Sequence, residues 1–281
     1  MTAAPGAPGA PVAPGAPGMA PRWTSSAKTG VGTALADASR VWFTLSHGIL
    51  NEIYYPRLDQ ACTRDLGLIV TDGRGFFSEE KRHTRSVQRP VAPGVPAYRL
   101  DNTCVRGRYR IEKEVTADPR RDAVLQRIRF RSLPGAPGAA GPYRLFALLA
   151  PHLGNRGWGN TAWAGDYKGA PMLFAERDGI ALALASSVPW RHRSVGYAGA
   201  SDGWLDLSRN GRLTREYQRA PDGNVALTGE IDLRAAPDGG FVLAFGFGGD
   251  AAEAGQRALA SLQDGFAAAL SRYVRQWRAW Q

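Results

Sequence analysis

Short apolar segments separated by turn sequences constrain the fold of this chain more than any other feature. From about Trp23 to Phe247, runs rich in Val, Ile, Leu, Phe and Tyr alternate with stretches of Gly, Asp, Asn and Pro. This pattern is typical of β-strands joined by hairpin turns. The clearest strands are predicted at residues 39–45, 65–71, 106–116, 124–132, 143–150, 172–176, 180–186, 224–233 and 240–247.

Turn sequences and side-chain alternation support that prediction. Asp-Gly and Pro-Asp-Gly turns, such as PDGN at 221–224 and PDGG at 237–240, favour hairpins. In RGRYRIEKEV (106–115), Tyr109, Ile111, Lys113 and Val115 fall on one face, and Arg and Glu fall on the other. So many strands without intervening helices predict an all-β fold, a large sandwich of two packed antiparallel sheets. The Pro/Gly stretch at 133–142 is predicted to be a long surface loop within it.

The pattern changes to helical after Gly249. Asp250 is a candidate N-cap, with Glu253 three residues later as in a capping box. Apolar residues then recur every three or four positions and stay in phase across Gly265. The chain ends in RQWRAWQ, so this helix either folds back on the sandwich or precedes a further domain, and we favour the second interpretation. The predicted apolar stripe is Ala254, Ala258, Leu262, Phe266, Leu270, Val274 and Trp277.

The first residues differ from the rest of the chain. Residues 3–21 read AAPGAPGAPVAPGAPGMAP, a composition that resists helix and sheet alike. We therefore divide the chain into an extended tail at 1–22, a sandwich at 23–249 and a helical segment at 250–281. The sequence shows neither a signal peptide nor an apolar run long enough to span a membrane, so we expect a cytoplasmic protein.

Composition disfavours several classes of partner. The net charge of +10 makes nucleic acid a candidate partner, but the arginines are scattered singly along strands and form no basic stripe. Cys62 and Cys104 allow one disulfide or none, and neither belongs to a CxxC pair. The four histidines show no metal-binding spacing, so we predict no metal site and no cofactor, and the sequence leaves calcium open.

The densest polar chemistry lies in SHGILNEIYYPRLDQACTRDLGLIVTD (46–72) and the residues that follow it. A pair of carboxylates in this region is one candidate for acid–base chemistry. The alternative, which we favour, is that these acids form ion pairs with Arg57, Arg64, Lys81 and Arg82. The acids are Glu52, Asp59, Asp65, Asp72, Glu79 and Glu80.

Two aromatic segments are candidates for ligand binding. The segment at 152–169, HLGNRGWGNTAWAGDYKG, combines flat apolar rings with polar groups, a mixture that suits sugars. In the alternative, its tryptophans cover the edge of the sandwich. The second segment, at 189–207, allows the same two readings, with Trp204 favoured for the core. The candidate sugar-binding residues are Trp158, Trp163, Tyr167, Asn155, Asn160 and Asp166.

Several long motifs in order carry a resemblance to a known family. They include RWTSSAKTGVGTA (22–34), SRVWFTLSHGILNEIYYPRLDQACTRDLGLIVTDG (39–73), FFSEEKR (76–82), VGYAGASDGWLDL (195–207) and PDGNVALTGEIDL (221–233). With these motifs, the chain from about Ala4 to Gln281 resembles the N-terminal domain of bacterial glucoamylases and glucodextranases.

The resemblance implies a super-β-sandwich related to galactose-mutarotase-like folds, followed by a helical linker and an α/α six-fold barrel. In that family the barrel hydrolyses α-glucosidic bonds from the non-reducing end with inversion, using two glutamates. Those glutamates have no counterpart in this chain, so we predict no catalytic residue here. Residues 250–281 become the linker toward the barrel, which is the expected partner.

Three functional hypotheses follow. In the first, this non-catalytic domain docks on the barrel. In the second, the sandwich itself binds α-glucan through the aromatics at 152–169 and 189–204. In the third, it is a mutarotase-like enzyme with His47 and either Glu52 or Asp59 in one pocket. The residues predicted to contact the barrel are Tyr54, Tyr55, Arg57, Asp59, Arg64, Asp65, Trp277 and Trp280.

Overall fold

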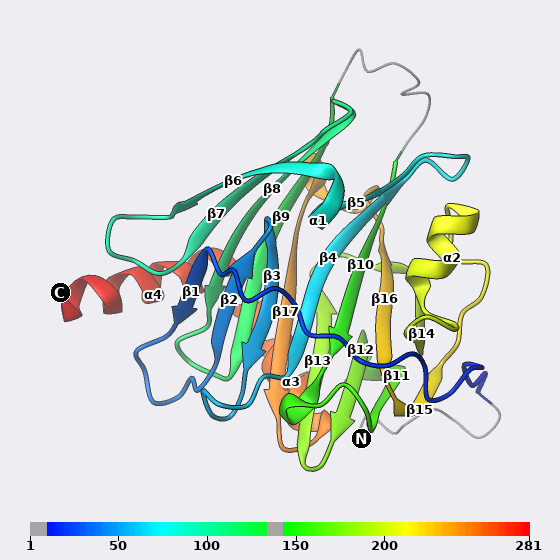
Figure 1. Ribbon diagram of the computed structural model, residues 1–281. Coiled ribbons are helices and arrows are strands. Elements are labelled where there is room, and N and C mark those ends of the chain that lie inside the picture. The colour runs from blue at the N-terminus through cyan, green and yellow to red at the C-terminus, as the bar shows by residue number, and fades with distance from the viewer. Residues whose placement is uncertain (1–9, 134–142) are drawn as a thin grey trace.

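A computed structural model describes residues 10–133 and 143–281 of the protein. Within these ranges, two large antiparallel sheets pack face to face, as Figure 1 shows. This architecture confirms the predicted all-β sandwich. The predicted loop at 133–142 lies, except for Leu133, outside the described residues.

The eight-stranded sheet has the order β1-β2-β3-β4-β10-β16-β14, with β5 paired to β4. Its long central strands were predicted, whereas β1, β3, β5 and β14 were not. The strands are β1 (Gly30–Thr33), β2 (Trp42–Ser46), β3 (Ile49–Tyr54), β4 (Thr63–Thr71), β5 (Phe77–Glu79), β10 (Arg144–Pro151), β14 (Trp190–Tyr197) and β16 (Val225–Ile231).

The nine-stranded sheet has the order β15-β11-β12-β13-β17-β9-β8-β7-β6. β13 has the predicted bounds, whereas β11 lies in the aromatic segment at 152–169, where the sequence predicted no strand. The strands are β6 (Thr84–Pro90), β7 (Tyr98–Cys104), β8 (Tyr109–Ala117), β9 (Ala123–Ser132), β11 (Asn160–Tyr167), β12 (Ala170–Arg177), β13 (Ile180–Ser186), β15 (Arg219–Gly223) and β17 (Gly240–Gly248).

Helices are few and lie outside the two sheets. The short α1 (Glu80–His83) follows β5, and α2 (Gly203–Asn210) follows β14 on the outer side of the eight-stranded sheet. α3 (Ala251–Asp264) and α4 (Phe266–Trp280) pack on the nine-stranded sheet, and two 3₁₀ turns, η1 (Leu153–Asn155) and η2 (Pro237–Gly239), complete the fold. No helix of the described chain is long and apolar enough to cross a membrane.

The C-terminal helical segment differs from its prediction in two ways. Gly265 adopts a φ of 84°, outside the helical region, and divides the segment into α3 and α4. α4 then folds back on the sandwich, where Tyr273 is fully buried. The Tyr273 hydroxyl accepts a hydrogen bond from the Thr33 backbone N–H at 3.1 Å, and Trp277 Nε1 donates to the Thr33 carbonyl at 3.0 Å. The interpretation that the helix folds back on the sandwich, which the sequence did not favour, therefore holds for this part of α4.

The main core lies between the sheets, and two sealed polar clusters cross the layers. Lys113, on the inner face of β8 as its alternation predicted, lies 2.7 Å from Glu80 Oε1. Both side chains are buried, and burial lowers the pKa of Lys113 against the opposing effect of Glu80. This pair joins the nine-stranded sheet to α1.

The second sealed cluster fixes α3 to the sandwich. Asp122 accepts from Arg40 at 2.6 Å and lies 3.1 Å from Arg257 of α3. The Asp122 side chain is 1% exposed. Helix α3 thus both supplies a cation to this carboxylate and covers it.

The N-terminal segment, residues 10–29, crosses the outer face of the eight-stranded sheet. It begins beside β15, where Val12 forms a parallel bridge to Arg219, and ends beside β2, where the Thr29 N–H donates to the Leu45 carbonyl. Figure 1 shows it as a dark blue trace in front of the sheet. Because it spans the sheet, it forms one wall of the cleft described below.

Candidate functional site

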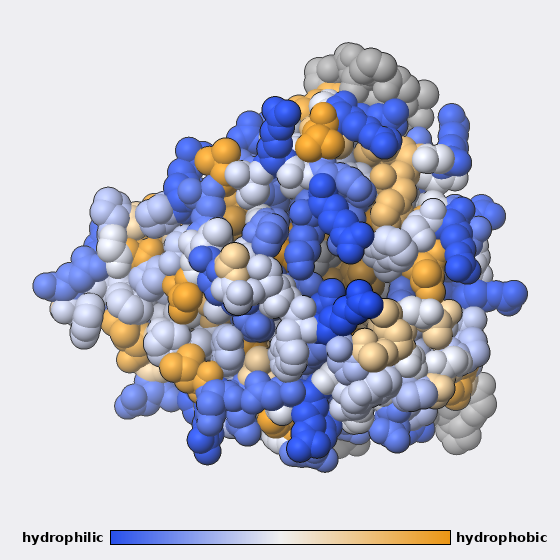
Figure 2. Space-filling view, viewed as in Figure 1, coloured by the Kyte–Doolittle hydropathy of each residue, from blue (hydrophilic) through white to orange (hydrophobic). Residues whose placement is uncertain are grey.

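A cleft of about 380 Å³ opens on the outer face of the eight-stranded sheet. Its floor is made of residues of β3, β4, β10 and β16. Its walls come from the N-terminal segment, α1 and α2. Figure 2 shows this face of the molecule hollowed between hydrophilic residues. The floor residues are Ile49, Gly67, Ile69, Leu148, Ala150, Val225 and Ala226.

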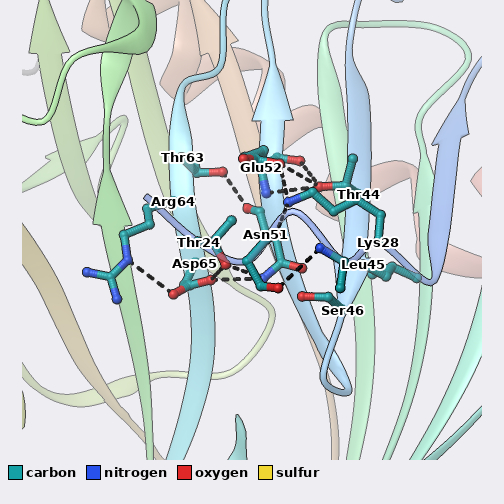
Figure 3. Close-up of polar contacts among 12 residues, drawn as sticks. Thr24, Lys28, Thr44, Leu45, Ser46, Asn51, Glu52, Thr63, Arg64 and Asp65 are labelled. Atoms are coloured by element: carbon teal, nitrogen blue, oxygen red, sulfur yellow. Dashed lines mark hydrogen bonds and ion pairs between the residues drawn. The ribbon is translucent and has the colours of Figure 1, made fainter. Parts of the chain in front are cut away.

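Asp65 of β4 is the centre of one polar wall (Figure 3). Its Oδ1 accepts hydrogen bonds of 2.8 Å from Thr24 Oγ1 and from Asn51 Nδ2. Its Oδ2 lies 3.1 Å from Lys81 Nζ and 3.3 Å from Arg64 Nε. Asp65 is 14% exposed, so four partners hold a carboxylate that still faces the cleft.

A β-bulge brings Asn51 into this wall. Phe43 pairs with Ile53 and Leu45 with Leu50, so Asn51 and its neighbour face Thr44 together. Because a bulge resets the alternation, Leu50 and Ile53 both enter the core while Asn51 hydrogen-bonds outside it.

Glu52, the other bulge residue, belongs to a neighbouring cluster. Its carboxylate lies 2.5 Å from Lys28 Nζ of the N-terminal segment. It also accepts from Tyr54 at 3.2 Å, and burial together with Glu52 raises the pKa of Tyr54 to about 12. Glu52 therefore binds a segment of the same chain, and Tyr54 supports Glu52.

Glu79 and Trp204 form the opposite wall of the cleft. Trp204 Nε1 donates to Glu79 Oε2 at 3.1 Å, and Arg82 Nε lies 3.3 Å from the same oxygen. The Trp204 ring packs edge-on against Phe77. α2 holds Trp204 in place because Asp202 caps its first turn by accepting from the Leu205 N–H. The half-buried Trp204 packs on a small apolar cluster that includes Phe146 and Leu207, as the sequence favoured, and it also lines the cleft.

The favoured prediction for the acids of this region is confirmed for Asp59, Asp65 and Glu79. Arg57 pairs with Asp59, Arg64 and Lys81 with Asp65, and Arg82 with Glu79. Glu52 and Glu80 pair instead with Lys28 and Lys113, and Asp72 accepts hydrogen bonds from backbone N–H groups.

The residues predicted to contact a barrel do not form one surface. Tyr55 points inward, is 4% exposed and contacts Arg40 and Arg257 through its hydroxyl. Trp280 is 70% exposed at the end of α4, near the C-terminus marked in Figure 1. The predicted set is thus divided among the cleft (Arg64, Asp65), the Glu52 cluster (Tyr54), the core (Tyr55), the β3–β4 loop (Arg57, Asp59) and the end of α4 (Trp277, Trp280).

The residues of the predicted sugar-binding segment also lie in different environments. Trp163 is fully buried, stacks on Phe174 and packs in the cluster beneath α3 and α4. Tyr167 is 7% exposed in the same cluster, so neither ring is available to a sugar. Asp166 pairs with Arg193 at 3.4 Å.

Asn155, Asn160 and Trp158 remain from that set. Asn155 has a structural contact, since its Nδ2 donates to the Asp59 carbonyl at 2.5 Å and its Oδ1 accepts from the Ala61 N–H at 2.8 Å. Asn160 is buried and accepts from the Leu153 N–H. Only Trp158, 41% exposed, presents a large apolar surface to solvent.

The mutarotase-like set does not converge. His47 lies in the β2–β3 turn, and Asp59 lies in the loop after β3, so the two flank opposite ends of one strand. Glu52 is held by Lys28.

The described residues offer no group of three or more His, Cys, Asp or Glu side chains that would hold a metal ion. Cys62 and Cys104 are both free and buried.

Comparison with known proteins identifies the family. The family model described as "Glucodextranase, domain N" matches residues 13–281. The chain belongs to this family. It is therefore an N-terminal domain of the glucoamylase type of glycoside hydrolase, as its motifs predicted.

Relatives of this domain N agree in sequence and in fold. A glucoamylase from Clostridium sp. (strain G0005) is 35% identical over 255 residues, which is 91% of this chain and 36% of the relative. The crystal structure of a bacterial glucoamylase complexed with acarbose matches with a TM-score of 0.91 and 33% identity, over 96% of this chain and 39% of that one. An inverting mannosidase of family GH92 from Bacteroides thetaiotaomicron shares the fold alone, at a TM-score of 0.50 and 10% identity, over 91% of this chain and 33% of that one. The chain spans somewhat more than a third of the length of the glucoamylases that it matches.

Proposed function

We propose that this chain is the non-catalytic N-terminal domain of an inverting α-glucan exo-hydrolase, and that it docks on and stabilises the catalytic barrel of the same polypeptide. Coverage carries the proposal. The glucoamylases match more than 90% of this chain, yet the chain accounts for only 36% and 39% of their lengths. The remainder of such a polypeptide has room for a separate catalytic domain.

The loop between β3 and β4 is the best-formed contact for that domain. Arg57 and Asp59 form a bidentate pair, with N–O distances of 3.0 and 2.8 Å, and are 71% and 64% exposed. Between them Leu58 is 56% exposed. Asn155 holds the loop from outside through its contacts to Asp59 and Ala61, so little order has to be gained on binding.

Two tryptophans extend the exposed apolar surface beside this loop. Trp158 follows η1, the turn that contains Asn155, and is 41% exposed. Trp23, 48% exposed, packs edge-on against His152 at a ring distance of 4.8 Å. With Leu58 they make an apolar set at one end of the sandwich, and aromatic residues are enriched at protein interfaces. Trp280, at the C-terminal end of α4 and of the predicted linker, is a separate proposed contact.

A pair of matched substitutions tests the docking role in a polypeptide that contains both this domain and the barrel. Leu58→Glu should lower the melting temperature and the turnover on maltooligosaccharides, since a charge would enter an apolar contact worth about 1–3 kcal/mol. Val105→Glu is the control because Val105 is 54% exposed, in the β7–β8 turn. Both variants should leave the melting of the isolated 281-residue chain unchanged. Equal behaviour of the two variants in the longer polypeptide would remove the docking role.

The isolated chain should release no glucose from maltooligosaccharides or dextran. Release of glucose by the purified chain, absent in a mock purification, would contradict the non-catalytic assignment.

A further inference from the structure

We propose that the cleft between the N-terminal segment, α1 and α2 binds a neutral monosaccharide or disaccharide. This assigns the domain a ligand of its own, at a site that does not include the β3–β4 loop. The inference needs only the chain described here and does not depend on the proposed function.

The size and the floor of the cleft suit one or two sugar rings. Its volume of about 380 Å³ lies near the lower end of ligand pockets, which measure roughly 300–1,000 Å³. Ile49, Ile69 and Leu148 give it an apolar floor that can pack against the C–H face of a sugar ring. Gly67 lies within this floor, and a Cβ built there would meet no atom within 4 Å. The space above β4 is therefore open.

The walls provide held hydrogen-bonding groups of both kinds. Asp65 and Glu79 are 14% and 17% exposed, and each is fixed by neighbouring donors. Lys81 and Arg82 supply N–H groups beside them, and Arg82 is 68% exposed. Sugar hydroxyls both donate and accept, so they can use a carboxylate and an adjacent cation together. Because these side chains are already paired, binding would order little more of the protein.

The charge of the cleft favours a neutral ligand over an anion. Three of its four basic side chains, Arg64, Lys81 and Arg82, are paired with Asp65 or Glu79. Asp202 adds a further negative charge. Trp204 also lines the cleft, with its Nε1 bonded to Glu79. Its indole ring offers the ligand an apolar surface beside a polar edge.

Two glycine substitutions give a matched test on the 281-residue chain. Gly67→Leu should fill the cleft without disturbing the fold, because its Cβ has free space and its φ is not positive. Gly75→Leu is the control, since Gly75 has the same two properties in the β4–β5 turn, outside the cleft. Thermal melting of both variants should match that of the wild type. Glu79→Gln, which keeps the shape of the wall, serves as an independent variant.

Binding is measured by ligand-observed NMR and tryptophan fluorescence with glucose, maltose and isomaltose. The wild type and Gly75→Leu should bind at least one of these sugars with a dissociation constant on the order of 1 mM. Gly67→Leu should weaken binding about tenfold or more, and Glu79→Gln should weaken it by a smaller factor.

Any of the following results would overturn the proposal. The first is no binding by the wild type at about 10 mM sugar, well above a millimolar dissociation constant. The second is binding that Gly67→Leu leaves unchanged, or displacement of the sugar by inorganic phosphate alone. The third is hydrogen-exchange protection of the cleft in the polypeptide with the barrel, combined with no sugar binding by the 281-residue chain. That result would assign the cleft to a protein contact. None of these outcomes depends on Leu58, so failure of the sugar site and failure of the docking role are distinguishable.

Discussion

Asp122 and Asp65 are both carboxylates that lie within salt-bridge distance of two basic side chains, yet only one of them is sealed. Asp122 contacts Arg40 and Arg257 and is 1% exposed because α3 covers it. Asp65 contacts Arg64 and Lys81 and is 14% exposed at the cleft wall. The same kind of ion pair therefore fixes α3 at Asp122 and leaves polar groups accessible to solvent at Asp65.

The element that covers the ion pair, and not the pair itself, therefore decides whether the carboxylate fixes the fold or stays accessible. A sealed pair has lost its water, and breaking it leaves an uncompensated charge in a low dielectric. A pair open to solvent contributes little to stability and keeps its hydrogen-bonding capacity for other partners. The following predictions test this distinction, from the largest effect to the smallest.

The largest effect should come from Lys113→Met. It would leave Glu80 buried without its cation, and the free energy of unfolding should fall by about 3–5 kcal/mol. The matched control is Lys81→Met, which removes a cation from the cleft pair and should cost about 1 kcal/mol or less. Urea denaturation of both variants measures the difference. Equal losses would show that sealing has no energetic consequence here.

The next effect concerns pH and His152, a sealed group of a different kind. His152 is 1% exposed, and neither ring nitrogen has a hydrogen-bond partner among residues 10–133 and 143–281. Burial, reinforced by the Arg64 charge, lowers its pKa from 6.5 to about 4. Between these values the unfolded chain binds a proton that the folded domain does not. The contribution of His152 to the free energy of unfolding should therefore be fully present above pH 6.5, and roughly 3 kcal/mol of it should be lost on going to pH 4.

His152→Leu should flatten that slope. Asp72, Asp206 and Asp264 also have lowered pKa values, but the stability that they contribute is lost mainly as the pH falls below 3.8, the ordinary pKa of Asp. The pH range from 4 to 6.5 therefore reports chiefly on His152. Denaturant titrations at intervals from pH 4 to 7 give the measurement. An unchanged slope in the variant would assign the pH dependence to other groups.

The smallest of these effects separates Asp122 from Asp65 directly. Asp122→Asn should lower the free energy of unfolding by about 2 kcal/mol through loss of charge-assisted hydrogen bonds. It should also speed amide exchange in α3, because Arg257 would lose its anchor. Asp65→Asn should cost about 1 kcal/mol or less and leave exchange in α3 unchanged. Faster exchange in α3 after Asp65→Asn would break the comparison.

Much of the sandwich could be predicted from alternation and turns. The face assignment of Tyr109, Ile111, Lys113 and Val115 is correct because a strand fixes side-chain direction with a period of two. β11 was missed because NTAWAGDY combines weak strand formers with polar residues, and its strand conformation depends on pairing with β12 and β15.

The candidate site could be predicted only in part. The ion pairs around Asp65 follow from the clustered charges, and their partners were correctly named. Trp163 stayed a candidate for sugar binding beside packing at the sandwich edge, because the sequence does not say which face of a strand a later helix will cover. α3 and α4 cover that face, and Trp163 is buried there. The break at Gly265 was missed because an apolar stripe in phase across a glycine does not report its φ.

By itself the sequence determined the two-sheet architecture, the family and the stock of paired charges, because these depend on periodicity, turn residues and local neighbours. Tertiary structure decided which of those charges are sealed and which line a cleft. Glu80 meets Lys113, and Asp122 meets Arg257, only after the sheets and α3 have packed. The N-terminal segment likewise becomes a cleft wall only through backbone and side-chain contacts to strands far away in the sequence. Such contacts join segments distant in sequence, and no local pattern encodes them.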